Sequence, residues 1–183
     1  MHLQLACVMA AVLAAAALFT GCSGGAKKAA PNDWVADVCT AAKTLSDQRA
    51  ASLLAFFEVD SEDGQAMYDG FNRYSETYGK ALDDFTTAAN KAGQPTVKDG
   101  GKVRKAVQQW ANDEKAANTN TQTKVSKLDR ASEHLAADIN DIFFAIQFAD
   151  LKQLLQTSGA VSAGDVIQLI EKDSQCAFAL FAE

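Results

Sequence analysis

The stretch MYDGFNRYSETYGKALDDFTTAANKA, residues 67–92, has the clearest periodicity in the chain. Its apolar and aromatic side chains recur in alternating steps of four and three residues, which places them on one face of an α-helix. These positions are Met67, Phe71, Tyr74, Tyr78, Ala81, Phe85, Ala88 and Ala92. We interpret this stripe as the buried face of a helix in a bundle. The alternative is that it lines a groove for an apolar ligand.

The stripe is bounded by helix signals on both sides. Gly93 is expected to cap the helix, and Pro95 forbids its continuation because proline has no backbone N–H. Upstream, Asp33 is the expected N-cap of a first helix that ends near Val59. The apolar positions of that first helix are Trp34, Val35, Val38, Cys39, Ala42, Leu45, Leu53, Phe56 and Phe57. An acidic run between the two helices suits a turn and a helix start: Glu58, Asp60, Glu62 and Asp63.

The downstream sequence predicts further helices. A third helix follows Asp99, and we expect it to break at Asn118–Thr121 because these side chains compete for backbone hydrogen bonds. Apolar periodicity resumes at Val125 and continues to Ile146. The segment 142–148 is apolar nearly all round, which is typical of a central, buried helix, and the alternative is contact with a lipidic ligand. A last helix places four apolar side chains inward: Val166, Ile170, Ala177 and Leu180.

Residues 32–183 are therefore expected to form one all-α domain, an antiparallel bundle of four to five helices. Cys39 and Cys176 lie in the first and last of these helices. Two thiols in an oxidising compartment usually pair, so we predict a disulfide between them. The alternative is a reactive thiol, although neither cysteine has a histidine nearby in sequence. A chain reversal at Asn118–Thr121 would bring the last helix back toward Cys39, as a disulfide requires.

The N-terminus predicts an export signal and a lipid anchor. Residues 3–20 are almost entirely apolar and stand at the start of the chain, as in a signal peptide. They lead into a run that resembles the bacterial lipobox: Leu18-Phe19-Thr20-Gly21-Cys22. This resemblance implies that residues 1–21 are removed and that Cys22 carries the lipid, while residues 22–31 form a flexible tether. The alternatives are an ordinary secretory signal and an uncleaved membrane anchor.

Charge and composition exclude several kinds of chemistry. The formal net charge is -6, and none of the charged side chains lies in the first 22 residues, so the exported domain is acidic. We therefore expect no nucleic-acid partner, because phosphate binding requires a basic face. His134 is the only histidine left after cleavage, and no phosphate-binding glycine loop or nucleophile elbow is present. We expect no cofactor and no enzymatic activity, with a carboxylate-only enzyme as the remote alternative.

One group of residues has the spacing of a weak metal site. His134, Asp138 and Asp141 stand at i, i+4 and i+7, so a helix would place them on one face. They could hold a divalent ion or relay a proton. A solvated helix face explains the same spacing, and we favour it. We accordingly predict no bound metal.

The overall pattern resembles the small exported helical lipoproteins of actinobacteria. The resemblance rests on the lipobox, on Trp34 to Cys39 at the start of a helix, and on the Gly93 to Gly100 turn with its Gly-x-Pro-x3-Asp-Gly spacing. It implies a location and a fold: an extracytoplasmic helical bundle held on the cell membrane through lipid on Cys22. The expected role is a non-enzymatic interaction module for another envelope protein. The alternative is a carrier or sensor of an apolar ligand seated between the Met67–Phe85 stripe and residues 142–148.

Overall fold

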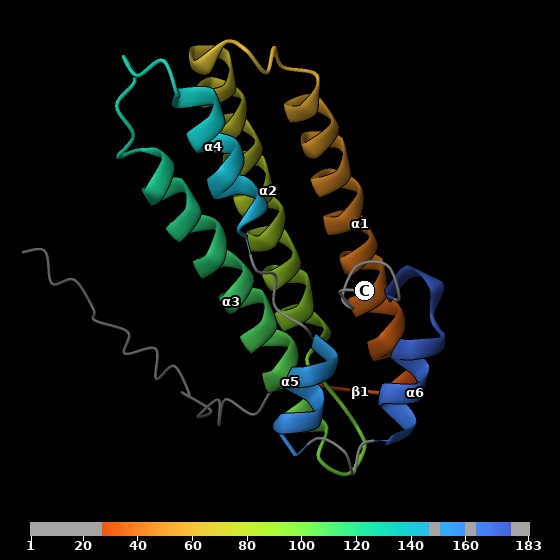
Figure 1. The fold of residues 1–183 in the computed structure, drawn as a ribbon. Helices are drawn as coiled ribbons and strands as arrows, with labels where there is room; N and C mark the ends of the chain where they lie inside the picture. The colour runs from red at the N-terminus through yellow and green to blue at the C-terminus, as the bar shows by residue number, and fades with distance from the viewer. Residues whose placement is uncertain (1–26, 147–150, 160–163, 177–183) are drawn as a thin grey trace, which may run out of the picture.

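The computed structural model describes residues 27–146, 151–159 and 164–176 (Figure 1). This part of the chain is almost entirely helical, which confirms the predicted all-α bundle. The elements in chain order are β1 (Lys28–Ala29), α1 (Pro31–Phe57), α2 (Gly64–Ala92), β2 (Gln94–Pro95), α3 (Gly100–Val125), α4 (Leu135–Phe144), α5 (Leu151–Thr157) and α6 (Gly164–Lys172). The six described helices exceed the predicted four to five, because two of them are short pieces near the C-terminus.

The three long helices lie side by side and alternate in direction (Figure 1). α2 packs between α1 and α3, α4 packs on α2 and α3, α5 packs on α3, and α6 packs on α1. β1, β2 and the start of α1 lie at one end of the bundle, which we call the tethered end. The turn between α1 and α2 and the start of α4 lie at the opposite end, which we call the far end.

α1 begins three residues earlier than the sequence predicted. Ala30 is the N-cap and Pro31 is the first helical residue, so Asp33 lies inside the first turn and is not the cap. Proline suits this position because its missing N–H has no acceptor in the first turn and its φ angle is already helical. Asp33 still lies where the helix dipole favours a negative charge. The helix ends at Phe57, close to the predicted end near Val59.

α2 carries the periodic stripe, and seven of its eight predicted positions are buried, with Ala88 half-buried. Asp63 caps the helix by accepting hydrogen bonds from Gln65 N and Ala66 N at 2.9 and 3.0 Å. At the other end Gly93 has a φ of +81°, a conformation that glycine adopts without strain. A Cβ atom at this position would lie 2.0 Å from the Lys27 carbonyl oxygen, so the backbones approach too closely for any other residue.

The predicted break at Asn118–Thr121 is wrong, because α3 runs through it without interruption. Asn118 Nδ2 donates to Ser75 O at 2.8 Å, and Ser75 Oγ donates to Asn118 Oδ1 at 3.0 Å, so α2 provides the partners for this side chain. Thr121 Oγ1 donates to Ala117 O at 2.8 Å, one turn back in the same helix. Contacts between the helices therefore outweigh the weak local propensity. The chain reverses instead between Ser126 and His134.

Residues 27–30, just before α1, are bonded to the bundle. The C-terminal part of the segment 22–31, predicted as a flexible tether, is therefore ordered. β1 pairs in parallel with β2, with Lys28 opposite Gln94 and Ala29 opposite Pro95. Gln94 N donates to Lys27 O at 2.8 Å, and Thr96 N donates to Ala29 O at 2.9 Å. A two-residue strand has too little periodicity to be recognised in sequence. The predicted signal peptide and Cys22 lie outside the described residues.

The segment 142–148, predicted as buried helix, is described only as far as Ile146. α4 ends at Phe144, where Phe143 is buried but Phe144 is exposed, so this segment is not enclosed on all sides as expected. In α6, Val166 and Ile170 are buried as predicted, whereas Ala177 and Leu180 lie outside the described residues. Cys39 and Cys176 form the predicted disulfide, with their Cα atoms 4.7 Å apart. Across the described ranges, no helix has the length and apolar character needed to cross a bilayer.

Candidate interaction surface

Three large apolar side chains are exposed on the far half of the bundle. Leu54 and Phe57 on α1 keep 65% and 53% of their surface accessible, and Phe144 on α4 keeps 72%. The ring of Phe143 lies between the two helices, 5.8 Å from the centroid of Phe57 and 5.5 Å from that of Phe144. Phe57 and Phe144 therefore rest on a shared buried ring, and together with Leu54, one turn before Phe57, we call them the apolar cluster.

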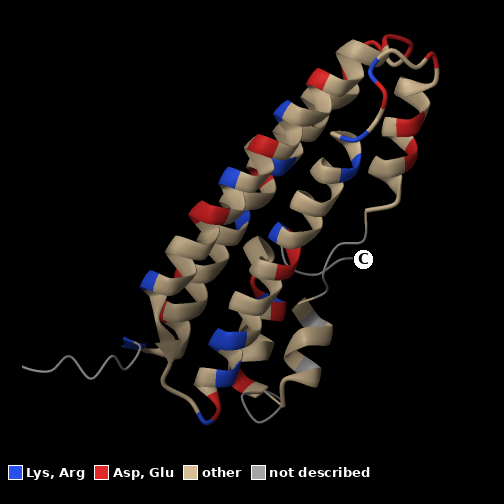
Figure 2. Cartoon of the chain, turned by 90° about the vertical axis from the view of Figure 1, so that its left-hand side faces the viewer, with Lys and Arg blue, Asp and Glu red and all other residues tan. Residues whose placement is uncertain are grey.

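An acidic side chain stands close to the apolar cluster in the sequence of each of its two helices. Glu58 follows Leu54 by four residues and Asp141 precedes Phe144 by three, so each acid neighbours an exposed apolar side chain on its own helix. Neither α1 nor α4 has a basic residue in its last turn. α4 carries acidic and no basic residues along its length (Figure 2). Because a helix C-terminus bears a partial negative charge, the two helix ends reinforce the carboxylates.

The structure does not assemble a metal site from the candidate residues. His134 is the N-cap of α4 and not part of the helix, so the predicted common helix face does not include it. Its side chain is largely exposed, and its Nε2 atom lies 3.6 Å from Glu133 Oε1. Asp138 is half-buried and Asp141 is exposed. Within the described ranges, no three or more His, Cys, Asp or Glu side chains are grouped so that they could hold a metal ion.

A buried polar pair joins α2 to α3 in the middle of the bundle. Tyr78 Oη donates a hydrogen bond of 2.5 Å to Glu114 Oε2, and the Glu114 side chain is only 1% exposed. Arg49 of α1 lies over the Tyr78 ring, with its Cζ atom 5.2 Å from the centroid. Burial raises the pKa of the Tyr78 hydroxyl far above its usual value, and the charge of Glu114 and the hydrogen bond to it raise it further. Burial also raises the pKa of Tyr74, partly offset by Arg49.

This polar pair holds helices together and does not present a reactive group to solvent. Both side chains are enclosed by the core, and a buried carboxylate requires hydrogen-bond partners to offset its lost hydration. The sequence analysis missed Glu114. The sequence did contain a signal for its burial, because Glu114 continues the three- and four-residue spacing of Val107 and Trp110 along the buried face of α3.

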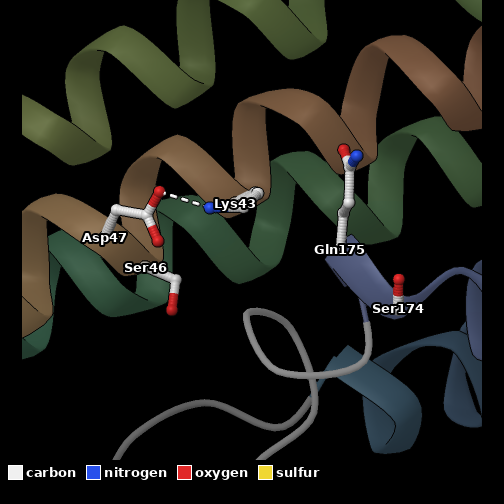
Figure 3. A pocket seen from close by; sticks show the side chains of 5 residues that line it. All are labelled: Lys43, Ser46, Asp47, Ser174 and Gln175. Atoms are coloured by element: carbon white, nitrogen blue, oxygen red, sulfur yellow. Dashed lines mark hydrogen bonds and ion pairs between the residues drawn. The ribbon is translucent and has the colours of Figure 1, made fainter.

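Two hollows lined by described residues are open to solvent. Figure 3 shows one of about 350 Å³ between α1 and the segment that follows α6, lined by Lys43, Ser46, Asp47, Ser174 and Gln175. Lys43 in this hollow forms an ion pair with Asp47 one turn along the same helix, with Nζ 2.6 Å from Oδ2. A second hollow of about 200 Å³ follows the groove between α1 and α2 beside Phe85.

An apolar ligand was predicted to bind between the Met67–Phe85 stripe and residues 142–148. In the described part of this region, up to Ile146, protein side chains occupy the space. Phe143 packs against Phe56 with ring centroids 5.1 Å apart and against Tyr74 at 5.6 Å. Phe56 and Phe71 meet edge to face at 6.2 Å. Phe71 and Tyr74 of the α2 stripe therefore belong to the hydrophobic core.

The comparisons with known proteins provide no relative from which function could be carried over. The chain matches no family model, no curated protein and no solved structure. The function proposed below is supported by the pattern of the sequence and by the geometry of the described residues.

Proposed function

We propose that this protein is a lipoprotein anchored on the extracytoplasmic face of the cell membrane and that its bundle is a non-enzymatic interaction module. One observation carries the proposal: the exposed apolar cluster lies toward the end of the bundle opposite the point where the N-terminal segment joins it. Exposed apolar groups with polar surroundings are typical of surfaces that bind another protein. The resemblance to exported lipoproteins of actinobacteria is part of the proposal.

The geometry supports a defined orientation on the membrane. Five residue steps separate Cys22 from Lys27, which allows a reach of at most about 17 Å between the proposed lipid attachment and the pinned backbone. α1 then extends for 27 residues, or about 40 Å, toward the far end. A lipid on Cys22 would thus keep the tethered end within about 17 Å of the bilayer, while the apolar cluster at the other end of α1 can extend away from it. This arrangement suits a module that presents a surface to a partner protein.

The test of the anchor is the substitution Cys22→Ala. Because the lipid is attached through the thiol of this cysteine, we expect the variant to lose incorporation of labelled palmitate. Cys7→Ala is the matched control, since Cys7 lies within the proposed signal peptide and should be removed with it. Equal labelling of wild type and Cys22→Ala would refute the assignment of the lipid to Cys22.

A further inference from the structure

We propose that the apolar cluster binds a basic amphipathic segment of another envelope protein, with apolar side chains on Leu54, Phe57 and Phe144 and with lysine or arginine over the surrounding acids. This inference deepens the proposed function and rests on it. It names the surface used and the chemistry of the partner. Three features of the described residues carry it: a rigid apolar platform, concentrated negative charge and distance from the tethered end.

The platform is rigid because it is built on the core. Leu54 and Phe57 stand three residues apart on α1, so they project from adjoining parts of one helix face. Phe143, which contacts the ring of Phe57, also packs against Phe56 and Tyr74, both of which are buried. An apolar partner would remove exposed surface from water without ordering a loop, since both cluster elements are helices. Such pre-organisation favours binding because less conformational entropy is lost.

The negative charge selects a basic partner. Glu58 and Asp141 flank the cluster, and the α1–α2 turn contributes three more exposed acids: Asp60, Glu62 and Asp63. The C-terminus of α1 adds its partial negative charge beside Glu58 and that of α4 adds its own beside Asp141, without a basic residue in either last turn. Exposed aromatic faces also attract ammonium and guanidinium groups. A helix with leucines on one side and lysines beside them is complementary to all of these features.

The same charges disfavour the other two candidates for this surface. A second copy would bring Glu58 and Asp141 of both chains together, and like charges in apposition oppose association. A lipid surface with anionic headgroups would be repelled by the same carboxylates. The membrane that carries the anchor is, in addition, on the side of the tethered end. The favoured occupant is therefore a basic protein segment.

The test uses the mature lipidated protein in detergent micelles and a synthetic probe. The probe is a 15-residue amphipathic peptide with leucine on one face and lysine on the other, and a matched peptide carries glutamate in place of every lysine. We expect the lysine peptide to bind and the glutamate peptide not to bind. Affinity should fall at least about tenfold in Phe57→Ser/Phe144→Ser and in Glu58→Lys/Asp141→Lys, as expected when an apolar anchor or a complementary charge is lost.

The control variant is Asp37→Lys/Glu76→Lys, which makes the same change in net charge at exposed acids elsewhere on α1 and α2. It should bind within about twofold of wild type, because steering by total charge alone is weak at physiological salt. Equal losses in the control and in Glu58→Lys/Asp141→Lys would overturn the proposal, as would tight binding of the glutamate peptide. Thermal melting of each variant establishes that the fold is retained.

Two further measurements distinguish the competing occupants. Sedimentation that shows a dimer abolished by Phe57→Ser/Phe144→Ser would assign the surface to a second copy and refute our proposal. Binding to phosphatidylglycerol vesicles that depends on the same two residues would assign it to lipid and also refute it. The proposed anchor is tested independently by labelling at Cys22. If the lysine peptide fails to bind while Cys22 is labelled as expected, only the docking site is refuted. If Cys22 is not labelled while the peptide binds, only the anchor is refuted.

Discussion

The two halves of α1 have similar apolar spacing but different surroundings. Near the tethered end, Trp34 and Cys39 are buried, the Trp34 indole donates to Gly93 O at 3.0 Å, and Cys39 is bonded to Cys176. Near the far end, Leu54 and Phe57 are exposed although the helix remains rich in apolar residues. The tethered half is covered by α6, which packs on α1, and the disulfide holds the segment after α6 against Cys39. Among the described residues, the last turn of α1 contacts α2 through Phe56 and the end of α4 through Phe57. The apolar pattern of a helix therefore predicts which face can be buried. Whether that face is buried depends on which other elements pack against it.

The largest effect on stability is expected from removing the disulfide between Cys39 and Cys176. Cys39→Ala/Cys176→Ala opens a loop with a sequence separation of 137 residues, which should lower the free energy of unfolding by about 5 kcal/mol in the chain-entropy model. Urea unfolding of wild type and variant measures the change. Reducing agent should weaken wild type toward the variant and leave the variant unchanged. An unaltered midpoint in the variant would show that packing alone holds α6 against α1.

Two adjacent phenylalanines test the contrast within one turn of α1. Phe56 is 2% exposed and contacts Phe71, Tyr74 and Phe143, so Phe56→Ala should cost about 3 to 5 kcal/mol through lost burial and a cavity. Phe57 is 53% exposed, and Phe57→Ala should cost less than about 1 kcal/mol. Calorimetric melting of both variants gives the comparison. Similar losses would mean that Phe57 is covered in solution, which would weaken its proposed role as a docking residue.

A smaller effect is expected from the polar pair between α2 and α3. Tyr78→Phe removes the hydrogen bond to the buried Glu114 carboxylate, which should cost about 1 to 3 kcal/mol. The raised pKa of Tyr78 adds a dependence on pH. Its contribution is present in full below pH 10, the usual pKa of tyrosine, and is lost as the pH rises above that value because only the unfolded chain then releases the proton readily.

The measurement is the free energy of unfolding between pH 7 and pH 11. Wild type should lose stability above pH 10 more steeply than Tyr78→Phe. Tyr68→Phe is the control, since Tyr68 lies half-buried at the surface with Arg130 over its ring at 4.6 Å. Identical alkaline profiles for wild type and Tyr78→Phe would show that Tyr78 does not contribute to this dependence.

The sequence by itself determined the helical class, the buried face of α2 and the pairing of Cys39 with Cys176. These features follow from local rules: the spacing of Met67 to Ala92, the need for glycine at position 93, and the tendency of two remaining thiols to pair. The tertiary structure alone decided that α3 continues through Asn118, because the hydrogen bonds that satisfy this side chain come from Ser75 on another helix. It also decided which phenylalanines are exposed and that Glu114 is buried, since both outcomes depend on neighbours distant in sequence that periodicity does not identify.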